Sequence, residues 1–356
     1  MSKALAVRIA IVAAIWSLLH LYVGLRVTAE LTGVPRVVVW AAVLGLAAAP
    51  FAAFAAGRRK RLRVTPALDW VGFTAMGLSS LLIVFFLVTD LLRLPVSALT
   101  VVGLAGVVTA LGTLQARRPR VVRVSVPITD LPPDLEGFRI VQISDLHVGP
   151  TLKRRFVERV VATANALDPD VVAVTGDVAD GFVSDLRDDV APLAGLVAPD
   201  GKFFVTGNHE YYWDAPGWIG EVERLGLAVL NHAYRVVERG AARLVFAGVP
   251  DLSVPSDPAT ALRGAPTSDV RILLAHQPKS AFAARAAGFD LQLSGHTHGG
   301  QYFPFNLLVR LFQPFVAGLH RLEAMWLYVS RGTGYWGPPL RLGAPSEITL
   351  IELARA

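Results

Sequence analysis

The segment FRIVQISDLH, residues 138–147, decides the fold that we expect of this chain. Its apolar, β-branched run at 138–143 is typical of a buried strand, and Asp145 and His147 follow that run directly. Polar side chains just after a strand are typical of a site at the carboxyl edge of an open α/β sheet. If the local backbone is extended, residues two apart such as these project to one side.

Other short motifs further along the chain repeat this arrangement. Each follows a candidate strand, and together with His147 they hold five of the eight histidines: Gly176-Asp177, Gly207-Asn208-His209-Glu210, His276 and Gly295-His296-Thr297-His298. Carboxylate and amide oxygens interleaved with neutral imidazoles suit a pair of borderline divalent ions. The sequence therefore predicts that separate loops converge on a two-metal hydrolytic site.

The rest of the second part of the chain alternates strand and helix patterns. Strands are predicted at 121–128, 138–143, 171–175, 203–206, 243–247, 271–275, 291–293, 325–329 and 348–351, and helices at 152–167 and 215–225. This order predicts a layered α/β sandwich over residues 121–356, which we expect to form a domain of its own.

Composition separates this domain from the first third of the chain. The sequence is 53% hydrophobic, with a mean hydropathy of +0.48, which is typical of a chain with a part in lipid. Lys and Arg number 13 against 3 Asp and Glu up to residue 120, and 21 against 25 after it. The positive charge therefore indicates membrane topology, and nucleic acid is not an expected partner. The absence of cysteine excludes disulfides, cysteine zinc sites and thiol nucleophiles.

Four apolar stretches at 9–25, 37–56, 70–89 and 96–114 are each close to the ~20 residues that cross a bilayer. They predict a four-helix transmembrane region over residues 1–120. The first stretch is short, so a signal peptide cleaved after Val27-Thr28-Ala29 is an alternative. We expect His20, Asp69 and Asp90 to lie at the interface or between helices, with an ion path as the alternative.

Two basic clusters indicate the orientation of this region. They comprise Arg58, Arg59, Lys60, Arg61 and Arg63, then Arg117, Arg118, Arg120 and Arg123. The positive-inside rule puts both termini and the C-terminal domain in the cytoplasm. Binding of anionic lipid headgroups is a second interpretation of the same clusters.

The ordered motifs resemble those of the calcineurin-like metallophosphoesterase superfamily, which run Asp-x-His, Gly-Asp, Gly-Asn-His-Asp/Glu, His and Gly-His-x-His. Gly299-Gly300-Gln301 and the segment 330–334 resemble a bacterial membrane-associated branch that includes UDP-diacylglucosamine pyrophosphohydrolase relatives. This resemblance implies an α-β-β-α sandwich and a chain in the bacterial inner or plasma membrane.

The resemblance also implies a role for each motif residue. One divalent metal ion (Mn, Fe or Zn) would bind Asp145, His147 and His298, a second would bind Asn208, His276 and His296, and Asp177 would bridge them. Hydroxide between the two metals would attack phosphorus. His209 would be the catalytic general acid or would stabilise charge on the phosphate, while Asp180 and Glu210 would orient metal-bound imidazoles. His232 and His320 lie outside the series and receive no role.

The resulting hypothesis is a membrane-anchored phosphoesterase that acts on a phosphodiester, pyrophosphate or phosphomonoester, either a small molecule or a lipid. A soluble-substrate phosphodiesterase, such as one for cyclic nucleotides, and a non-catalytic metal-binding sensor or scaffold are the alternatives. The aromatic segment 302–315 either packs in the core or dips into the membrane beside the site. The turn-rich loop around Gly332, Gly334, Trp336 and Pro338-Pro339 is expected to be a connector, with a roof over the site as the alternative.

Overall fold

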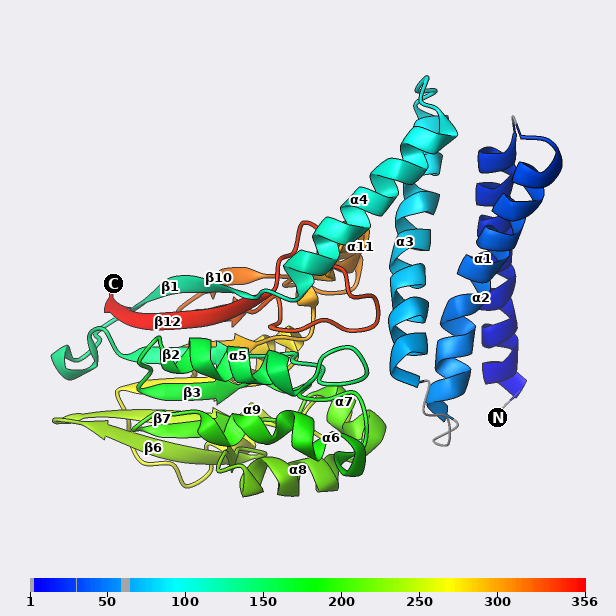
Figure 1. Cartoon of the computed structure of the whole chain (residues 1–356). Helices are drawn as coiled ribbons and strands as arrows, with labels where there is room; N and C mark the ends of the chain where they lie inside the picture. The colour runs from blue at the N-terminus through cyan, green and yellow to red at the C-terminus, as the bar shows by residue number, and fades with distance from the viewer. Residues whose placement is uncertain (1–2, 30, 59–64) are drawn as a thin grey trace. The chain divides into compact units, whose positions relative to one another are not determined.

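The structure is a computed structural model that describes residues 3–29, 31–58 and 65–356 (Figure 1). The chain divides into two compact units, Met1–Leu114 with Gly337–Leu340, and Gln115–Trp336 with Arg341–Ala356. We call them the helical unit and the α/β unit. The predicted basic residues Arg59, Lys60, Arg61 and Arg63 lie outside the described residues.

The described residues of the helical unit form four long helices. They are α1 (Lys3–Thr28), α2 (Gly33–Arg58), α3 (Thr65–Leu91) and α4 (Ala98–Ala116). Each contains a stretch that is long and apolar enough to cross a membrane. These helices are apolar on all sides, and many of their large apolar side chains are exposed, which is the surface expected of helices that lie in lipid.

Polar side chains of the helical unit pair between α1 and α3. His20 is buried, and its Nε2 lies 2.9 Å from Oγ of Ser79. Asp90 accepts a hydrogen bond of 2.6 Å from the hydroxyl of Tyr22 and forms an ion pair of 2.7 Å with Arg26. His20 and Asp90 therefore join neighbouring helices, which agrees with the predicted packing role.

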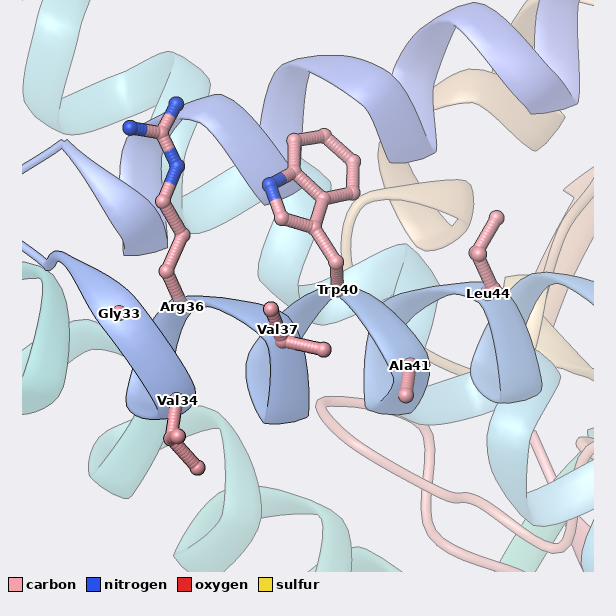
Figure 2. A pocket seen from close by; sticks show the side chains of 7 residues that line it. All are labelled: Gly33, Val34, Arg36, Val37, Trp40, Ala41 and Leu44. Carbon is pink, nitrogen blue, oxygen red and sulfur yellow. The ribbon is translucent and has the colours of Figure 1, made fainter.

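A hollow on α2 is shown in Figure 2. Its lining residues are Gly33, Val34, Arg36, Val37, Trp40, Ala41 and Leu44. The Trp40 ring packs on Gly24 of α1, where a Cβ atom would meet it at 2.4 Å. Arg36 is the one charged residue among the seven, so the hollow is lined mainly by apolar groups.

The α/β unit is built on two six-stranded sheets. The first has the order β1 (Arg120–Ile128), β12 (Glu347–Arg355), β2 (Arg139–Ile143), β3 (Val171–Val174), β4 (Gly201–Phe204), β5 (Ala228–Val229). Strands β2 to β5 are parallel to one another, whereas β12 runs antiparallel to β2 and parallel to β1. All four residues of β3 are buried, as expected for a strand covered on both faces.

The second sheet has the order β10 (Gly318–Leu322), β11 (Met325–Val329), β9 (Leu291–Ser294), β8 (Val270–Leu274), β7 (Ala242–Gly248), β6 (Ala233–Arg239). Its four inner strands are parallel, and its two edge strands are antiparallel to their neighbours. The parallel strands of both sheets therefore present their carboxyl ends to loops that can carry a site.

Seven helices connect the strands of the α/β unit. They are α5 (Arg154–Asn165), α6 (Val183–Val190), α7 (Asn208–Trp213), α8 (Ala215–Arg224), α9 (Pro258–Ala261), α10 (Ala281–Ala286) and α11 (Phe305–Leu308). All of them except α7 and α11 pack on the outer faces of the sheets. Short 3-10 turns are η1 (Pro133–Leu135), η2 (Ala191–Gly195), η3 (Pro278–Ser280), η4 (His298–Gly300) and η5 (Val309–Leu311).

Three apolar clusters join these layers. Ile140 and Phe203 of the first sheet meet Phe246 and Leu293 of the second in one of them. The outer clusters pack α5, α6 and α8 on the first sheet, and α9 and α10 on the second. The fold is therefore the predicted α-β-β-α sandwich. Every predicted strand occurs with ends within two residues, except that β12 runs four residues past 351. Strands β5, β6 and β10 were not predicted.

Candidate metal centre

The structure brings all seven predicted ligands together at the carboxyl ends of strands. Asp145 and His147 follow β2, Asp177 follows β3, Asn208 begins α7 after β4, His276 follows β8, and His296 and His298 follow β9. All are buried except His296, which is partly buried. Residues from both sheets therefore line one site.

The ligand loops have a left-handed backbone. The φ angle is +53° at Asp145, +47° at His147, +54° at Asp177, +71° at His296 and +52° at His298. We expected an extended backbone to place Asp145 with His147, and His296 with His298, on one side. That expectation is wrong, because the backbone of these residues is left-handed. Side chains rarely tolerate this conformation, and such strain gathers at functional sites.

Two glycines allow the loops to approach this closely. A Cβ atom at Gly176, which has a φ of +86°, would lie 2.5 Å from the backbone nitrogen of Gly207. At Gly295 a Cβ atom would lie 2.0 Å from Oγ of Ser144. Any side chain at either position would push neighbouring ligand loops apart.

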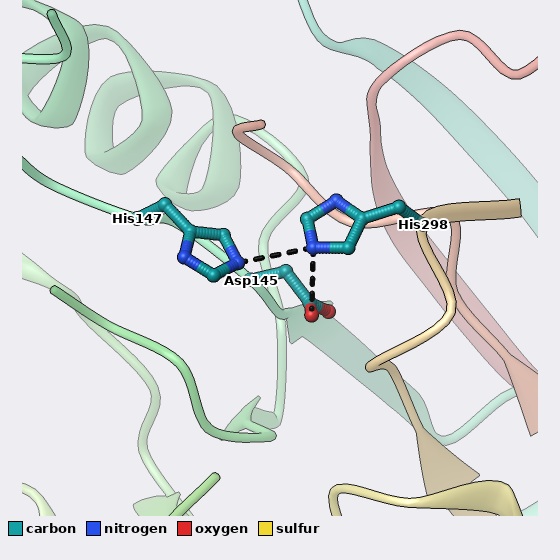
Figure 3. A group of neighbouring side chains, drawn as sticks. All are labelled: Asp145, His147 and His298. Atoms are coloured by element: carbon teal, nitrogen blue, oxygen red, sulfur yellow. Dashed lines mark hydrogen bonds and ion pairs between the residues drawn. The ribbon is translucent and has the colours of Figure 1, made fainter. Parts of the chain in front are cut away.

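The first group of ligand atoms comes from Asp145, His147 and His298 (Figure 3). Nε2 of His147 lies 3.0 Å from Nε2 of His298, which lies 3.3 Å from Oδ1 of Asp145. The backbone N–H of His296 donates to the Asp145 carboxylate at 3.0 Å, which fixes its orientation. Ligand atoms about 2.1 Å from one metal ion lie roughly 3.0–3.4 Å from one another, so this spacing fits a single cation.

The second group comes from Asn208, His276 and His296. Nδ1 of His296 lies 2.9 Å from Oδ1 of Asn208 and 3.3 Å from Nε2 of His276. Nδ1 of His276 donates to the carbonyl of Thr175 at 2.7 Å, so its Nε2 is the atom that points into the group. One proton cannot satisfy an oxygen and two nitrogens that face one another, whereas a divalent cation can.

Asp177 joins the two groups. Its Oδ2 lies 3.2 Å from Nε2 of His276 and 3.8 Å from Nε2 of His147. Burial raises the pKa of Asp177, but the positive charges of His276 and His147 outweigh burial and lower the pKa below its usual range. The carboxylate therefore stays charged at neutral pH, as a ligand shared by two cations must be.

The surrounding imidazoles have opposite pKa shifts. Burial opposes charge on His147, but the carboxylates of Asp180, Asp177 and Asp145 outweigh burial and raise its pKa to about 9. Burial and the charge of His276 lower the pKa of His296 to about 4, so this imidazole is neutral and able to ligate at pH 7.

His209 lies beside the two groups. Its Nδ1 is 2.5 Å from Oδ1 of Asp180, and its Nε2 is 4.0 Å from Oδ2 of Asp177. The same Asp180 oxygen lies 3.1 Å from Nδ1 of His147. Asp180 therefore orients two imidazoles, as predicted, and directs Nε2 of His209 toward the centre.

Glu210 has a different role from the predicted one. Its carboxylate accepts hydrogen bonds from the backbone N–H groups of Asp177 at 3.0 Å, Val178 at 2.8 Å and Gly207 at 2.6 Å. It therefore contacts the backbone of two ligand loops, where we predicted contact with an imidazole. Burial, with the nearby charge of Asp177, raises the pKa of Glu210 to about 7.

The loop after β11 lies against the site. The N–H of Thr333 donates to the Ser144 carbonyl at 2.7 Å, and that of Gly334 donates to the Asp145 carbonyl at 2.9 Å. The ring of Trp336 is 5.9 Å from that of His209. These contacts favour the roof alternative for this loop over the connector that we expected.

Arg341 is a residue near the site that the sequence did not reveal. It is fully buried, and its Nη1 donates to the carbonyls of His298 at 2.9 Å and Arg331 at 2.6 Å. Its Nη2 lies 2.9 Å from Nδ1 of His298. Nothing in the sequence around Arg341 indicates that it is buried beside the site, because most arginines are exposed.

The two histidines without a predicted role contact other parts of the chain. Nε2 of His232 accepts from the N–H of Asp257 at 3.0 Å. Nε2 of His320 donates to the carbonyl of Ala317 at 3.1 Å. Neither belongs to the groups of possible metal ligands among the described residues.

Comparison with known proteins agrees with this geometry. The profile of a family described as Calcineurin-like phosphoesterase matches residues 138–300. A Danio rerio protein named Transmembrane protein with metallophosphoesterase domain is 41% identical over 256 residues, 68% of this chain and 59% of that protein. Its Bos taurus counterpart is 40% identical over 281 residues, 74% of this chain and 62% of that protein.

A shorter bacterial relative is matched almost throughout. A metallophosphoesterase of Aquifex aeolicus is 33% identical over 243 residues, 66% of this chain and 91% of that protein. By contrast, the chain spans about 60% of the length of the two vertebrate relatives. Because the bacterial match covers nearly a whole protein and the profile spans every ligand motif, the chain belongs to the calcineurin-like phosphoesterase family.

Proposed function

We propose that this protein is a membrane-anchored, metal-dependent phosphoesterase with two cations in its site. The first cation would bind Asp145, His147 and His298, and the second Asn208, His276 and His296, with Asp177 shared. The observation that carries the proposal is the Asp177 carboxylate, with one oxygen 3.2 Å from the second group and 3.8 Å from the first. A shared carboxylate suits two cations about 3.5–4 Å apart.

Two divalent cations held there would make water more acidic and offset the negative charge of a phosphate ester. The protein's own residues keep the ligands in place for that chemistry. Thr175 fixes the tautomer of His276 through its carbonyl, and Asp180 does so for His147. The backbone N–H of His296 holds the Asp145 carboxylate.

His209 is the proposed catalytic residue. Because Asp180 holds its Nδ1, its Nε2 is free to face a phosphate oxygen or the leaving oxygen. When its imidazole is protonated, Nε2 can donate a proton to the leaving group. The residues that would bind metal do not perform this step. The neighbouring Tyr212 ring, 5.0 Å away, limits the positions that His209 can adopt.

The membrane helices suggest where the substrate lies. Four helices long enough to span a bilayer precede the α/β unit, and the vertebrate relatives are named as transmembrane proteins. By the positive-inside rule, Arg117, Arg118, Arg120 and Arg123 favour a cytoplasmic α/β unit at a bacterial inner or plasma membrane. A lipid or lipid-linked phosphate ester would be within reach of such a site.

The test is hydrolysis by the full chain in detergent, stripped of metal with a chelator and reloaded with Mn²⁺, Fe²⁺ or Zn²⁺. The panel contains an aryl phosphodiester, an aryl phosphomonoester, a cyclic nucleotide and a lipid pyrophosphate. We expect metal-dependent hydrolysis that Asp177→Asn abolishes and His320→Ala leaves unchanged. Preference for the cyclic nucleotide would favour a membrane-anchored phosphodiesterase that acts on a soluble substrate. No hydrolysis by metal-loaded protein would favour a sensor and contradict the proposal.

A further inference from the structure

The segment after the last ligand motif exposes a run of large apolar side chains. The exposed fractions are 46% at Phe305, 58% at Leu307, 45% at Leu308, 75% at Leu311 and 73% at Phe312. Neither α11 nor η5 buries a single residue. Core packing therefore does not explain the middle of this segment, and contiguous exposed apolar side chains indicate an interaction surface.

Contacts at both ends of this segment anchor it to the rest of the α/β unit. At its start Tyr302 is buried, and its carbonyl accepts from the N–H of Asn306 at 3.2 Å. At its end Phe315 packs on an apolar cluster beneath the second sheet, 5.8 Å from the ring of Phe282. A Cβ atom at Gly300 would lie 2.2 Å from Cα of Asn306, so the segment folds back tightly on the ligand loop.

The surface is connected directly to the candidate metal centre. The turn η4 contains the ligand His298 and ends at Gly300, five residues before Phe305. Gln301 Nε2 donates to the carbonyl of Trp336 at 2.9 Å, and the N–H of Trp336 donates to Gln301 Oε1 at 3.0 Å. The Trp336 ring in turn lies 5.9 Å from His209.

Two features identify a bilayer as the occupant of this surface. Helix α4, long enough to span a membrane, ends at Ala116, and β1 of the α/β unit begins at Arg120. The link from Ala116 to Arg120 reaches about 14 Å at most, so the start of β1 stays close to the membrane that holds α4. Exposed Arg310 among the apolar side chains suits lipid phosphates, as in elements that lie at membrane interfaces.

We propose that residues 305–312 form a membrane-docking surface, which inserts its apolar side chains at the lipid–water interface of the bilayer that holds the chain's own helices. Phe305, Leu308, Leu311 and Phe312 enter the interface, and Arg310 contacts lipid phosphates. In consequence, the adjoining site receives an amphiphilic phosphate ester directly from the membrane. This consequence for the substrate rests on the proposed function, whereas the docking itself does not.

The test uses the absence of cysteine from the chain. Full-length Leu308→Cys and Leu311→Cys variants are labelled with an environment-sensitive fluorophore and reconstituted into phosphatidylcholine nanodiscs. The matched control is Val197→Cys, exposed in the turn before β4, at the opposite strand ends from the ligand loops. Fluorescence is quenched with lipid-attached nitroxide and, separately, with aqueous iodide, and thermal unfolding checks that each variant folds.

We expect lipid-attached nitroxide to quench the labels at positions 308 and 311 at least about threefold more than the label at 197, with the reverse order for iodide. Equal lipid quenching at all three positions would overturn the proposal. Protection of 308 and 311 from both quenchers would also overturn it, because protein would then cover the surface. The quenching measurements do not require substrate hydrolysis. They therefore test membrane docking independently of the proposed phosphoesterase activity.

Discussion

Nε2 of His147 lies 3.0 Å from Nε2 of His298, although 151 positions separate the two residues in the chain. The two nitrogens can hold this distance by sharing one proton or by binding one cation. The adjacent Asp145 carboxylate, with Oδ1 3.3 Å from His298, makes a divalent cation the ligand that fits.

The first prediction concerns the independence of the two metal groups. His298→Ala should lower bound metal from about two to about one per chain, because it removes a ligand of the first group alone. Elemental analysis of the purified full-length protein measures this. His320→Ala is the matched control, and unchanged metal content in His298→Ala would remove His298 from the ligand set.

The second prediction separates His209 from the ligands. His209→Gln should keep the bound metal and lower kcat by about 10²–10⁴, because a general acid or charge-stabilising imidazole is lost. The loss should be greater for an alkyl phosphodiester than for an aryl one, whose leaving group needs less protonation. A similar loss on both esters would argue for a charge-stabilising role, and unchanged kcat would exclude catalysis by His209.

The third prediction concerns the membrane-docking surface. Leu308→Asp with Phe312→Asp should lower turnover of a phosphate ester embedded in vesicles by about tenfold, because charge is placed at the lipid interface. Turnover of a soluble aryl phosphodiester should be unchanged. Equal loss on both substrates would mean that the double variant damages the site itself and would reject the delivery role.

The fourth prediction concerns the buried arginine. Burial lowers the pKa of Arg341 to about 10, so it remains charged at pH 7 and donates to the carbonyls of His298 and Arg331. Arg341→Met should orphan these acceptors at a cost of about 1–3 kcal/mol each and weaken metal binding through His298. Denaturant unfolding and metal titration measure the two effects, with exposed Arg155→Met as control. If Arg341→Met binds metal with wild-type affinity, Arg341 stabilises the fold but does not support metal binding.

The core of the fold could be predicted from the sequence because its strands are apolar throughout. The run at 171–174 is Val-Val-Ala-Val, and it becomes a strand that is buried on both faces. The three strands that were missed, β5, β6 and β10, all lie at sheet edges. There β6 carries three charged residues among its seven, while β5 has only two residues, so neither has the continuous apolar run of a buried strand.

The site was predictable in residue type but not in conformation. Asp145, His147 and the other candidate ligands could be picked out because few structural roles require such residues in that order. Their left-handed backbone is set by contacts between loops, such as the N–H of Asp145 donating to the Gly176 carbonyl at 3.0 Å. The same long-range contacts brought Trp336 and Arg341 to the site. The narrower resemblance to UDP-diacylglucosamine pyrophosphohydrolase relatives stays a prediction.

Electron paramagnetic resonance of the Mn²⁺-loaded full-length protein tests the central claim most directly. Two Mn²⁺ ions that share the Asp177 carboxylate lie about 3.5–4 Å apart and couple magnetically. We predict a coupled two-manganese spectrum that Asp177→Asn replaces with the signal of isolated ions. A spectrum of isolated Mn²⁺ alone in the wild-type protein, at saturating metal, would contradict the account.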